Sequence, residues 1–214
     1  MQKQIRTEIM PTTFPRAIEQ ALQVLSQGGL VAFPTDTVYG LGALAFRPQS
    51  VAQIYHVKGR PRNKAIPILL DSSRHLLEVA AEIPAEAWLL AEKFWPGPLT
   101  IVLPRNPTVP DVVTAGGPSV AIRVPDHDFA LQLIDAAGGM LAATSANLSG
   151  RPDPVTAQEV LGYLDGRIDL ILDGGPCPGG RVSTVVDLTG ASPVIVRPGA
   201  ISLQELEEVL HGSG

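Results

Sequence analysis

Cysteine and long apolar runs are almost missing from this chain of 214 residues, whose single cysteine is Cys177. A lone cysteine cannot form an internal disulfide, so nothing here calls for an oxidising compartment. No apolar run reaches the roughly 18 residues that a membrane span needs, and residues 1–17 are mixed and polar, unlike a secretory signal. We therefore expect a cytoplasmic protein with no membrane segment.

Several common catalytic patterns are also missing. The sequence has no G-x-x-x-x-G-K-[ST] phosphate loop and no G-x-S-x-G elbow, and Gly40 and Gly42 lack the third glycine of a dinucleotide-binding loop. Its four histidines form no pair at helix-face spacing, and Cys177 has no partner thiol. We therefore expect no metal site built from protein side chains.

Positive charge is scarce as well. The chain has 16 basic and 21 acidic residues, a net charge of −5, and only 5% aromatic residues. A general nucleic-acid coat depends on phosphate neutralisation and on stacking, so this composition argues against one. A local basic site remains compatible with it.

Glycine and proline, by contrast, are frequent, with 21 and 20 residues, and they separate short apolar runs. Strands are predicted at 30–33, 41–46, 65–70, 99–103, 119–124, 139–143, 168–172, 183–188 and 194–197. Helices are predicted at 15–27, 50–57, 72–80, 85–94, 129–137, 156–161 and 203–210. This alternation indicates an α/β fold with one mixed sheet, and we expect a single domain over 1–214 with its core at about 15–210.

The clearest functional signal is the loop Lys58-Gly59-Arg60-Pro61-Arg62-Asn63-Lys64. Four of the 16 basic residues fall within it, with no acidic residue among them. Lysine supplies a point charge and arginine a planar fork for phosphate, so the loop suits an anion site. A solvated basic turn would have the same composition.

Two polar segments follow predicted strands, where α/β sheets place ligand-binding loops. Residues 34–40 carry two threonine hydroxyls and the Asp36 carboxylate, which we consider as an orienting group. In residues 144–150, Ser145 and Asn147 stand two apart, so an extended chain would turn both side chains the same way. Ordinary hydroxyl-rich turns remain the alternative for both segments.

Three further features could belong to the same site. Arg123 and Arg197 each close an apolar strand, where a charge needs a partner or a ligand; a structural salt bridge would also explain each. Residues 174–184 are glycine-rich and could bring backbone N–H groups to a ligand or simply form a mobile connector. Cys177 lies in this segment with no histidine near it in sequence, so we do not consider it catalytic.

Taken together and in order, these segments resemble the threonylcarbamoyl-AMP synthase family, which has the YrdC-like fold. The resemblance covers about residues 15–210, without the linker and second domain of longer members, so it points to the short, single-domain branch. The matching motifs are PTDTVYGLG (34–42), KGRP (58–61), FWPGPLT (94–100), VAIRVPDH (120–127), ATSANLSG (143–150), STVVD (183–187) and VRPG (196–199).

The resemblance implies a twisted mixed sheet flanked by helices around a basic concave cavity. It also implies synthesis of L-threonylcarbamoyl-AMP from L-threonine, bicarbonate and ATP, with release of pyrophosphate. A separate transferase would then move the group onto tRNA to make N6-threonylcarbamoyladenosine. Mg²⁺ would arrive with ATP, and catalysis would need no covalent intermediate, only positioning and cations facing the phosphates.

The same resemblance assigns ten residues by motif position. The nucleotide side would comprise Lys58, Arg60, Lys64, Ser119, Asn147 and Arg197, with Lys58 and Arg60 as the catalytic cations on the phosphates. The threonine side would comprise Thr35, Arg123, Ser145 and Ser183, with Arg123 on the amino-acid carboxylate.

Some positions depart from the family pattern. Residues 65–70 contain no histidine, although some members carry a threonine-contacting histidine there. Val155 stands where threonine or serine is frequent, and residues 180–182 lack a frequent acidic residue. These departures concern the detail of the threonine pocket and leave the reaction class unchanged.

Two other functions remain possible from sequence alone. The first is a non-enzymatic RNA-binding module that uses the basic cavity to read shape, and weak RNA binding could also accompany the enzyme. The second is a serine hydrolase with Ser145 as nucleophile and Lys58 as base.

Overall fold

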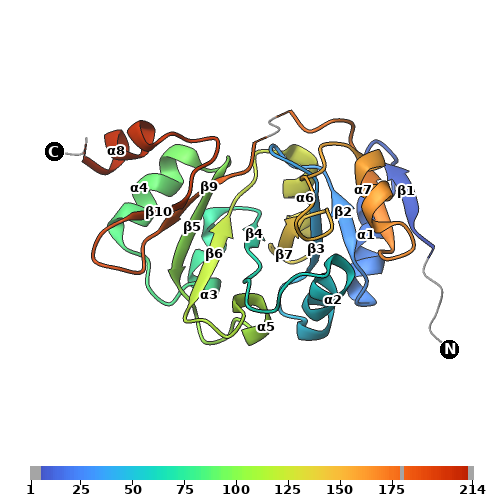
Figure 1. Ribbon diagram of the computed structural model, residues 1–214, viewed down its shortest axis with the longest axis horizontal. Coiled ribbons are helices and arrows are strands. Elements are labelled where there is room, and N and C mark those ends of the chain that lie inside the picture. The colour runs from blue at the N-terminus through green and yellow to red at the C-terminus, as the bar shows by residue number, and fades with distance from the viewer. Residues whose placement is uncertain (1–5, 179–180, 212–214) are drawn as a thin grey trace.

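The computed structural model describes residues 6–178 and 181–211, and through them runs one mixed sheet in the order β1-β8-β2-β3-β7-β4-β6-β5-β9-β10 (Figure 1). The strands are β1 (Glu8–Pro11), β2 (Val31–Phe33), β3 (Gly40–Leu44), β4 (Ile68–Leu70), β5 (Leu99–Pro104), β6 (Ser119–Arg123), β7 (Met140–Ser145), β8 (Leu170–Asp173), β9 (Thr184–Asp187) and β10 (Val194–Arg197). This single-domain α/β fold confirms the predicted fold class.

Helices cover the two faces of the sheet unequally. On one face α1 (Ala17–Ser26) and α6 (Asp128–Ala136) pack together over β2, β7 and β8. The larger core lies on the other face beneath α2 (Pro48–Lys58), α3 (Leu76–Val79), α4 (Ala85–Phe94), α5 (Asp111–Thr114), α7 (Ala157–Leu164) and α8 (Leu203–His211). Strands buried on both sides explain the continuous apolar runs. Within the described ranges no helix is long and apolar enough to cross a bilayer.

All nine predicted strands appear, but two elements were not predicted. Strand β1 pairs in parallel with β8, so the sheet begins at residue 8, before the expected start of the core near residue 15. Only Met10 of its four residues is buried, which leaves no alternation to detect. Helix α5 has four residues, too few for a helical period. The predicted helix 72–80 is a 3₁₀ turn (Ser73–His75) followed by α3.

Because α1 and α6 cover only part of their face, the strands β6, β5, β9 and β10 lie beyond these two helices (Figure 1). On that side the strands leave a row of side chains uncovered. Strand register builds the row: Arg123 lies opposite Leu69, Val185 opposite Thr100, and Arg197 opposite Val185. Residues far apart in sequence thereby form the floor of one cavity.

The chain after β10 crosses close to the start of β9 at Gly199. The Ala200 N–H donates to the Val182 carbonyl at 3.1 Å, and Thr184 Oγ1 donates to the Ile201 carbonyl at 2.7 Å. A Cβ on Gly199 would lie 2.4 Å from the carbonyl carbon of Ser183. Only glycine therefore permits this crossing without moving backbone.

We expect Gly199→Ala to lower the free energy of unfolding by about 1–3 kcal/mol, because overpacking forces the backbone of 182–184 away. Gly162→Ala is the matched control, since a Cβ there meets nothing within 4 Å in α7. It should raise stability by about 0.5–1 kcal/mol through helix propensity. Urea unfolding of both variants measures the difference, and equal effects would contradict the close-approach argument.

Candidate active site

A cavity of about 350 Å³ lies over the open row of the sheet. It is lined by residues of β3, β4, β5, β6, β7, β9 and β10 and of neighbouring loops, including the loop between β2 and β3, and it contains three arginines and one carboxylate. The polar residues that line it are Thr35, Thr37, Arg60, Thr100, Arg123, Thr144, Ser145, Asp153, Ser183 and Arg197.

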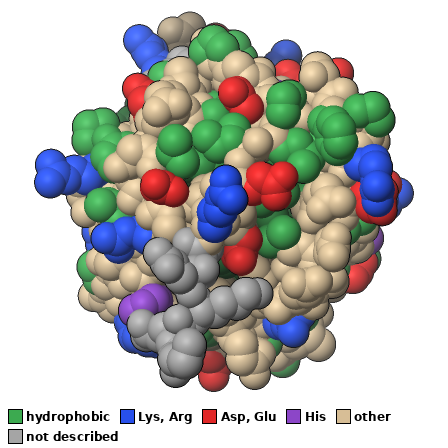
Figure 2. All heavy atoms as spheres, turned by 90° about the vertical axis from the view of Figure 1, so that its right-hand side faces the viewer, with side chains coloured by type: hydrophobic (Ala, Val, Ile, Leu, Met, Phe, Trp, Pro, Cys, Tyr) green, Lys and Arg blue, Asp and Glu red, His purple; other side chains and the backbone are tan. Residues whose placement is uncertain are grey.

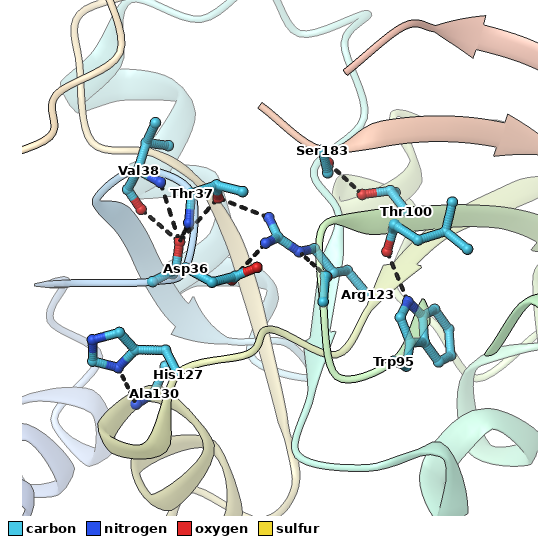
Figure 3. A network of polar contacts seen from close by, with 12 residues as sticks. Asp36, Thr37, Val38, Trp95, Thr100, Arg123, His127, Ala130 and Ser183 are labelled. Atoms are coloured by element: carbon cyan, nitrogen blue, oxygen red, sulfur yellow. Dashed lines mark hydrogen bonds and ion pairs between the residues drawn. The ribbon is translucent and has the colours of Figure 1, made fainter. Parts of the chain in front are cut away.

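Arg123 is the most deeply buried charge of the cavity, with 7% of its surface exposed. Its Nε donates to the Gly97 carbonyl at 2.9 Å, Nη1 to Thr37 Oγ1 at 2.9 Å, and Nη2 to Asp36 Oδ1 at 2.6 Å (Figure 3). Burial lowers the pKa of Arg123, while the Asp36 carboxylate opposes that shift. Each Nη group carries a second hydrogen, which suits bidentate binding of a carboxylate.

The loop that follows β2 is fixed by its own hydroxyls. Thr35 Oγ1 donates to the Val38 carbonyl at 2.7 Å and accepts the N–H groups of Thr37 and Val38. It also lies 3.0 Å from Thr37 Oγ1, which accepts from Arg123. The hydroxyl-rich turn expected as an alternative is therefore present, and it orients the arginine as well.

A second hydroxyl pair lies on the far side of Arg123 (Figure 3). Ser183 Oγ and Thr100 Oγ1 are 2.7 Å apart and both side chains are buried. Arg197 donates from Nη2 to Ser183 Oγ at 2.9 Å and to the Ser183 carbonyl at 2.8 Å. Desolvation lowers the pKa of the Arg197 guanidinium. Residues 179 and 180 of the glycine-rich segment nearby lie outside the described residues.

Arg60 comes from the basic loop. Gly59 ends α2 in the left-handed conformation (φ 60°), and Arg60 then turns back to donate from Nε to the Lys64 carbonyl at 3.1 Å and from Nη2 to the Ala65 carbonyl at 2.7 Å. Desolvation lowers the pKa of Arg60, but arginine stays charged at neutral pH. Arg60 is thus the member of this loop that lines the cavity.

Lys58 lies at the last position of α2 and is 3% exposed, not in the loop as expected. Its ammonium donates to the main-chain oxygen of Ser145, to that of Asn147 at 2.6 Å and to Asn147 Oδ1 at 2.8 Å. Desolvation lowers the pKa of Lys58 to about 7; Arg60 adds to the shift and Asp153 opposes it. All three hydrogens of a protonated lysine are therefore used to hold the end of β7.

Ser145 and Asn147 do meet, as their spacing predicts. Ser145 Oγ donates to Asn147 Oδ1 at 2.8 Å, and Asn147 Nδ2 donates to Asp153 Oδ1 at 3.2 Å. Because Ser145 Oγ bonds the amide and Lys58 bonds the main chain, this arrangement is not a Ser–Lys nucleophile pair. Ser145 itself belongs to β7, which extends two residues beyond the predicted strand.

The structure brings eight of the ten predicted residues together. Six line the cavity, namely Thr35, Arg60, Arg123, Ser145, Ser183 and Arg197, and Lys58 and Asn147 lie directly behind Ser145. The two others are outside that set: the side chain of Lys64 is exposed, and Ser119 begins β6 opposite Pro104.

Four polar lining residues escaped the sequence assignment. Thr37, Thr100 and Thr144 stand inside the motifs PTDTVYGLG, FWPGPLT and ATSANLSG, so motif membership could have indicated them. Asp153 gave no such signal, because only the turn after Asn147 brings it to the cavity. Among the described residues, His, Cys, Asp and Glu form no group of three or more that could hold a metal ion.

With this geometry established, comparisons with known proteins become informative. The family model for Sua5, YciO and YrdC, described as "Telomere recombination", matches residues 23–199. The threonylcarbamoyl-AMP synthase of Pyrococcus abyssi is 47% identical over 90% of this chain and 57% of its own length. A putative threonylcarbamoyl-AMP synthase of Mycobacterium tuberculosis is 39% identical over 94% of this chain and 92% of its own length.

The first curated relatives are longer than this chain, which spans between 55% and 59% of their lengths. Among solved structures, P. abyssi Sua5 complexed with L-threonine superimposes with a TM-score of 0.91 at 44% identity, covering 97% of this chain and 61% of that one. Sequence and fold agree: the chain belongs to the Sua5/YciO/YrdC family.

Proposed function

We propose that this protein synthesises L-threonylcarbamoyl-AMP from L-threonine, bicarbonate and ATP and releases pyrophosphate. The observation that carries the proposal is the convergence of residues from all seven motifs on one cavity of about 350 Å³. Relatives at 44–47% identity are named threonylcarbamoyl-AMP synthases, and one solved relative holds L-threonine. The product would be handed to a separate transferase that modifies tRNA.

The threonine half of the cavity would centre on Arg123. Its guanidinium, fixed by Asp36 and Thr37, would bind the amino-acid carboxylate. Thr35, Ser145 and Ser183 line the same cavity, and their hydroxyls would read the amine and the threonine hydroxyl. Asp36 therefore orients the arginine, which is a more specific role than sequence alone gave it.

The nucleotide half would use Arg60 and Arg197 on the phosphates, because both line the cavity and carry partly buried charge. Lys58 and Asn147 would support this half by fixing the end of β7. Direct contacts from Lys58, Lys64 and Ser119 to ATP stay predictions, and for Lys58 a contact would require exchange of one of its present hydrogen bonds.

The chemistry follows from these positions. The neutral threonine amine attacks the carbon of carbon dioxide or bicarbonate to give a carbamate. A proton is released with carbon dioxide, and a water molecule leaves with bicarbonate. A carbamate oxygen then attacks the α-phosphorus of ATP, the bond to the β-phosphate oxygen breaks, and pyrophosphate leaves. Placement of the reactants and cations facing the developing charge would supply the catalysis.

Mg²⁺ would enter on the triphosphate. Magnesium in such sites takes one or two carboxylates together with substrate phosphates, and Asp153 is the carboxylate that the described lining offers. Bound there, the ion would neutralise charge on the phosphates.

The proposal is tested by measuring pyrophosphate release from ATP with threonine and bicarbonate, each omitted in turn. Release that depends on all three supports the synthase. Release without threonine would contradict the synthase. No release under any condition while RNA binds tightly would favour the binding module.

Arg60→Ala should lower turnover roughly 10- to 150-fold, the effect of losing a charge-assisted phosphate contact. Arg60→Lys should recover it only in part, because lysine lacks the two-pronged geometry. Arg62→Ala is the matched control, since Arg62 lies in the same loop, is exposed and lies outside the cavity lining. Equal activity of the three variants would contradict the assignment of Arg60 to the phosphate site. Thermal unfolding checks that each variant is folded.

The cavity should select threonine over valine by well over tenfold, because valine leaves a buried hydroxyl partner unpaired. Serine loses only a methyl group and should be the better substitute. Comparing kcat/KM for the three amino acids in the pyrophosphate assay gives the ratios. Equal use of valine and threonine would show that the site recognises shape alone.

Occupation of the cavity by ATP and threonine should raise the melting temperature, because these ligands bind only the native state. RNA binding should be weak, fall steeply with salt and be displaced by ATP. Figure 2 shows that basic and acidic side chains are interspersed on the face that carries β1 and α7, and such mixed charge does not favour binding of RNA phosphates there. RNA binding that is tight and salt-resistant, with no thermal shift from ATP and threonine, would contradict the enzyme.

A further inference from the structure

A second cavity of about 340 Å³ lies behind the candidate active site. The loop of residues 95–97 separates the two: Gly97 holds Arg123 in the first cavity, whereas Trp95, Pro96 and Val124 line the second. The cavities share no lining residue. The second is lined by Asp71, Ser72, Ser73, Trp88, Ala91, Glu92, Trp95, Pro96 and Val124.

Both tryptophans of the chain line this cavity. Trp88 is on the exposed side of α4 and keeps 44% of its surface accessible. Trp95 is partly buried, and its Nε1 donates to the Leu99 carbonyl at 2.7 Å, which fixes the indole (Figure 3). Two indoles at one cavity offer large aromatic surfaces to a ligand, and an indole is the preferred ring for binding a cation.

The polar wall of the cavity is acidic and incompletely bonded. The Asp71 side chain is only 8% exposed; Arg74 binds its Oδ2, and His75 Nε2 lies 3.3 Å from its Oδ1. Asp71 Oδ1 and Ser72 Oγ are buried and make no hydrogen bond among the described residues. Buried polar atoms without a hydrogen-bond partner are costly. Both residues line the cavity, so a ligand's donor group that reached these two atoms would be stabilised.

Charge around this wall is predominantly negative. Glu92 also lines the cavity, and Glu78 and Asp135 lie within the network that joins Asp71, Arg74 and His75. Arg74 is already shared between Asp71 and Asp135. An anion would therefore be repelled, whereas a cation would meet both the carboxylates and the indoles.

We infer that this cavity is a binding site for an organic cation, namely a guanidinium or ammonium group on an aliphatic stem. The aliphatic part would lie against Trp88 and Trp95, and the charged group would donate to Asp71 and Ser72. Such a cation could come from a free polyamine or from an arginine or lysine side chain of a protein.

Binding of the cation can be measured by the fluorescence of Trp88 and Trp95, which line the cavity. Intrinsic fluorescence of the intact protein is titrated with n-butylguanidinium and, as a neutral isostere, with n-butylurea at equal ionic strength. We expect a saturable change with the cation and none with the urea. A change that is linear with concentration, or equal for both compounds, would overturn the inference.

Substitutions of lining residues test whether the cation binds in this cavity. Asp71→Asn should weaken it about 10- to 150-fold through loss of a charge-assisted hydrogen bond. Trp88→Ala, read by Trp95, should weaken it about two- to thirtyfold. Asp71 also binds Arg74, so Asp71→Asn removes a structural ion pair as well. Glu92 is exposed, so Glu92→Gln carries little risk to folding, and it should also weaken binding of the cation. Unchanged affinity in both Trp88→Ala and Glu92→Gln would overturn the assignment.

The source of the cation is tested in the same assay with spermidine and with acetyl-arginine amide. Tighter binding of spermidine than of butylguanidinium would support a free polyamine. Tighter binding of the arginine derivative would support a protein side chain. Saturable binding of neither would contradict the site.

Discussion

The candidate site depends on one buried guanidinium. A charge removed from water is strongly disfavoured unless hydrogen bonds and an opposite charge replace its hydration. Arg123 at the end of β6 meets that requirement by binding Asp36 and Thr37 from one loop and the Gly97 carbonyl from another. Loss of one partner of such a pair costs about 3–5 kcal/mol, so the arginine fixes both loops where they enclose the cavity.

Lys58 has a comparable role at the end of β7. Its ammonium joins the C-terminus of α2 to the end of β7, through two carbonyls and the Asn147 side chain. The lysine thus couples the basic loop that follows α2 to the segment that presents Ser145. Two buried basic side chains therefore organise the cavity, while the more accessible Arg60 and Arg197 line it.

The sequence predicted much of the fold because apolar runs bounded by glycine and proline mark strands buried on both faces. It missed β1, where only Met10 is buried, and α5, which has four residues, because neither is long enough to show a period. For the site, motif resemblance assigned the residue types. The local pattern, with helix 50–57 followed by a segment containing Gly59 and Pro61, predicted a loop position for Lys58. That residue is in α2 because Gly59, and not Lys58, ends the helix.

The sequence by itself determined the fold class, the basic loop and the family resemblance, since local patterns of polarity and motif order are properties of the chain. Tertiary structure decided which side chains meet. The register of β4, β6, β5, β9 and β10 places Arg123, Thr100 and Arg197 on one face, and the partial cover by α1 and α6 leaves that face open. Strand pairing joins residues far apart in sequence, and a shift of one residue would turn each to the opposite face, so no local pattern could specify the cavity or the partners of its buried charges.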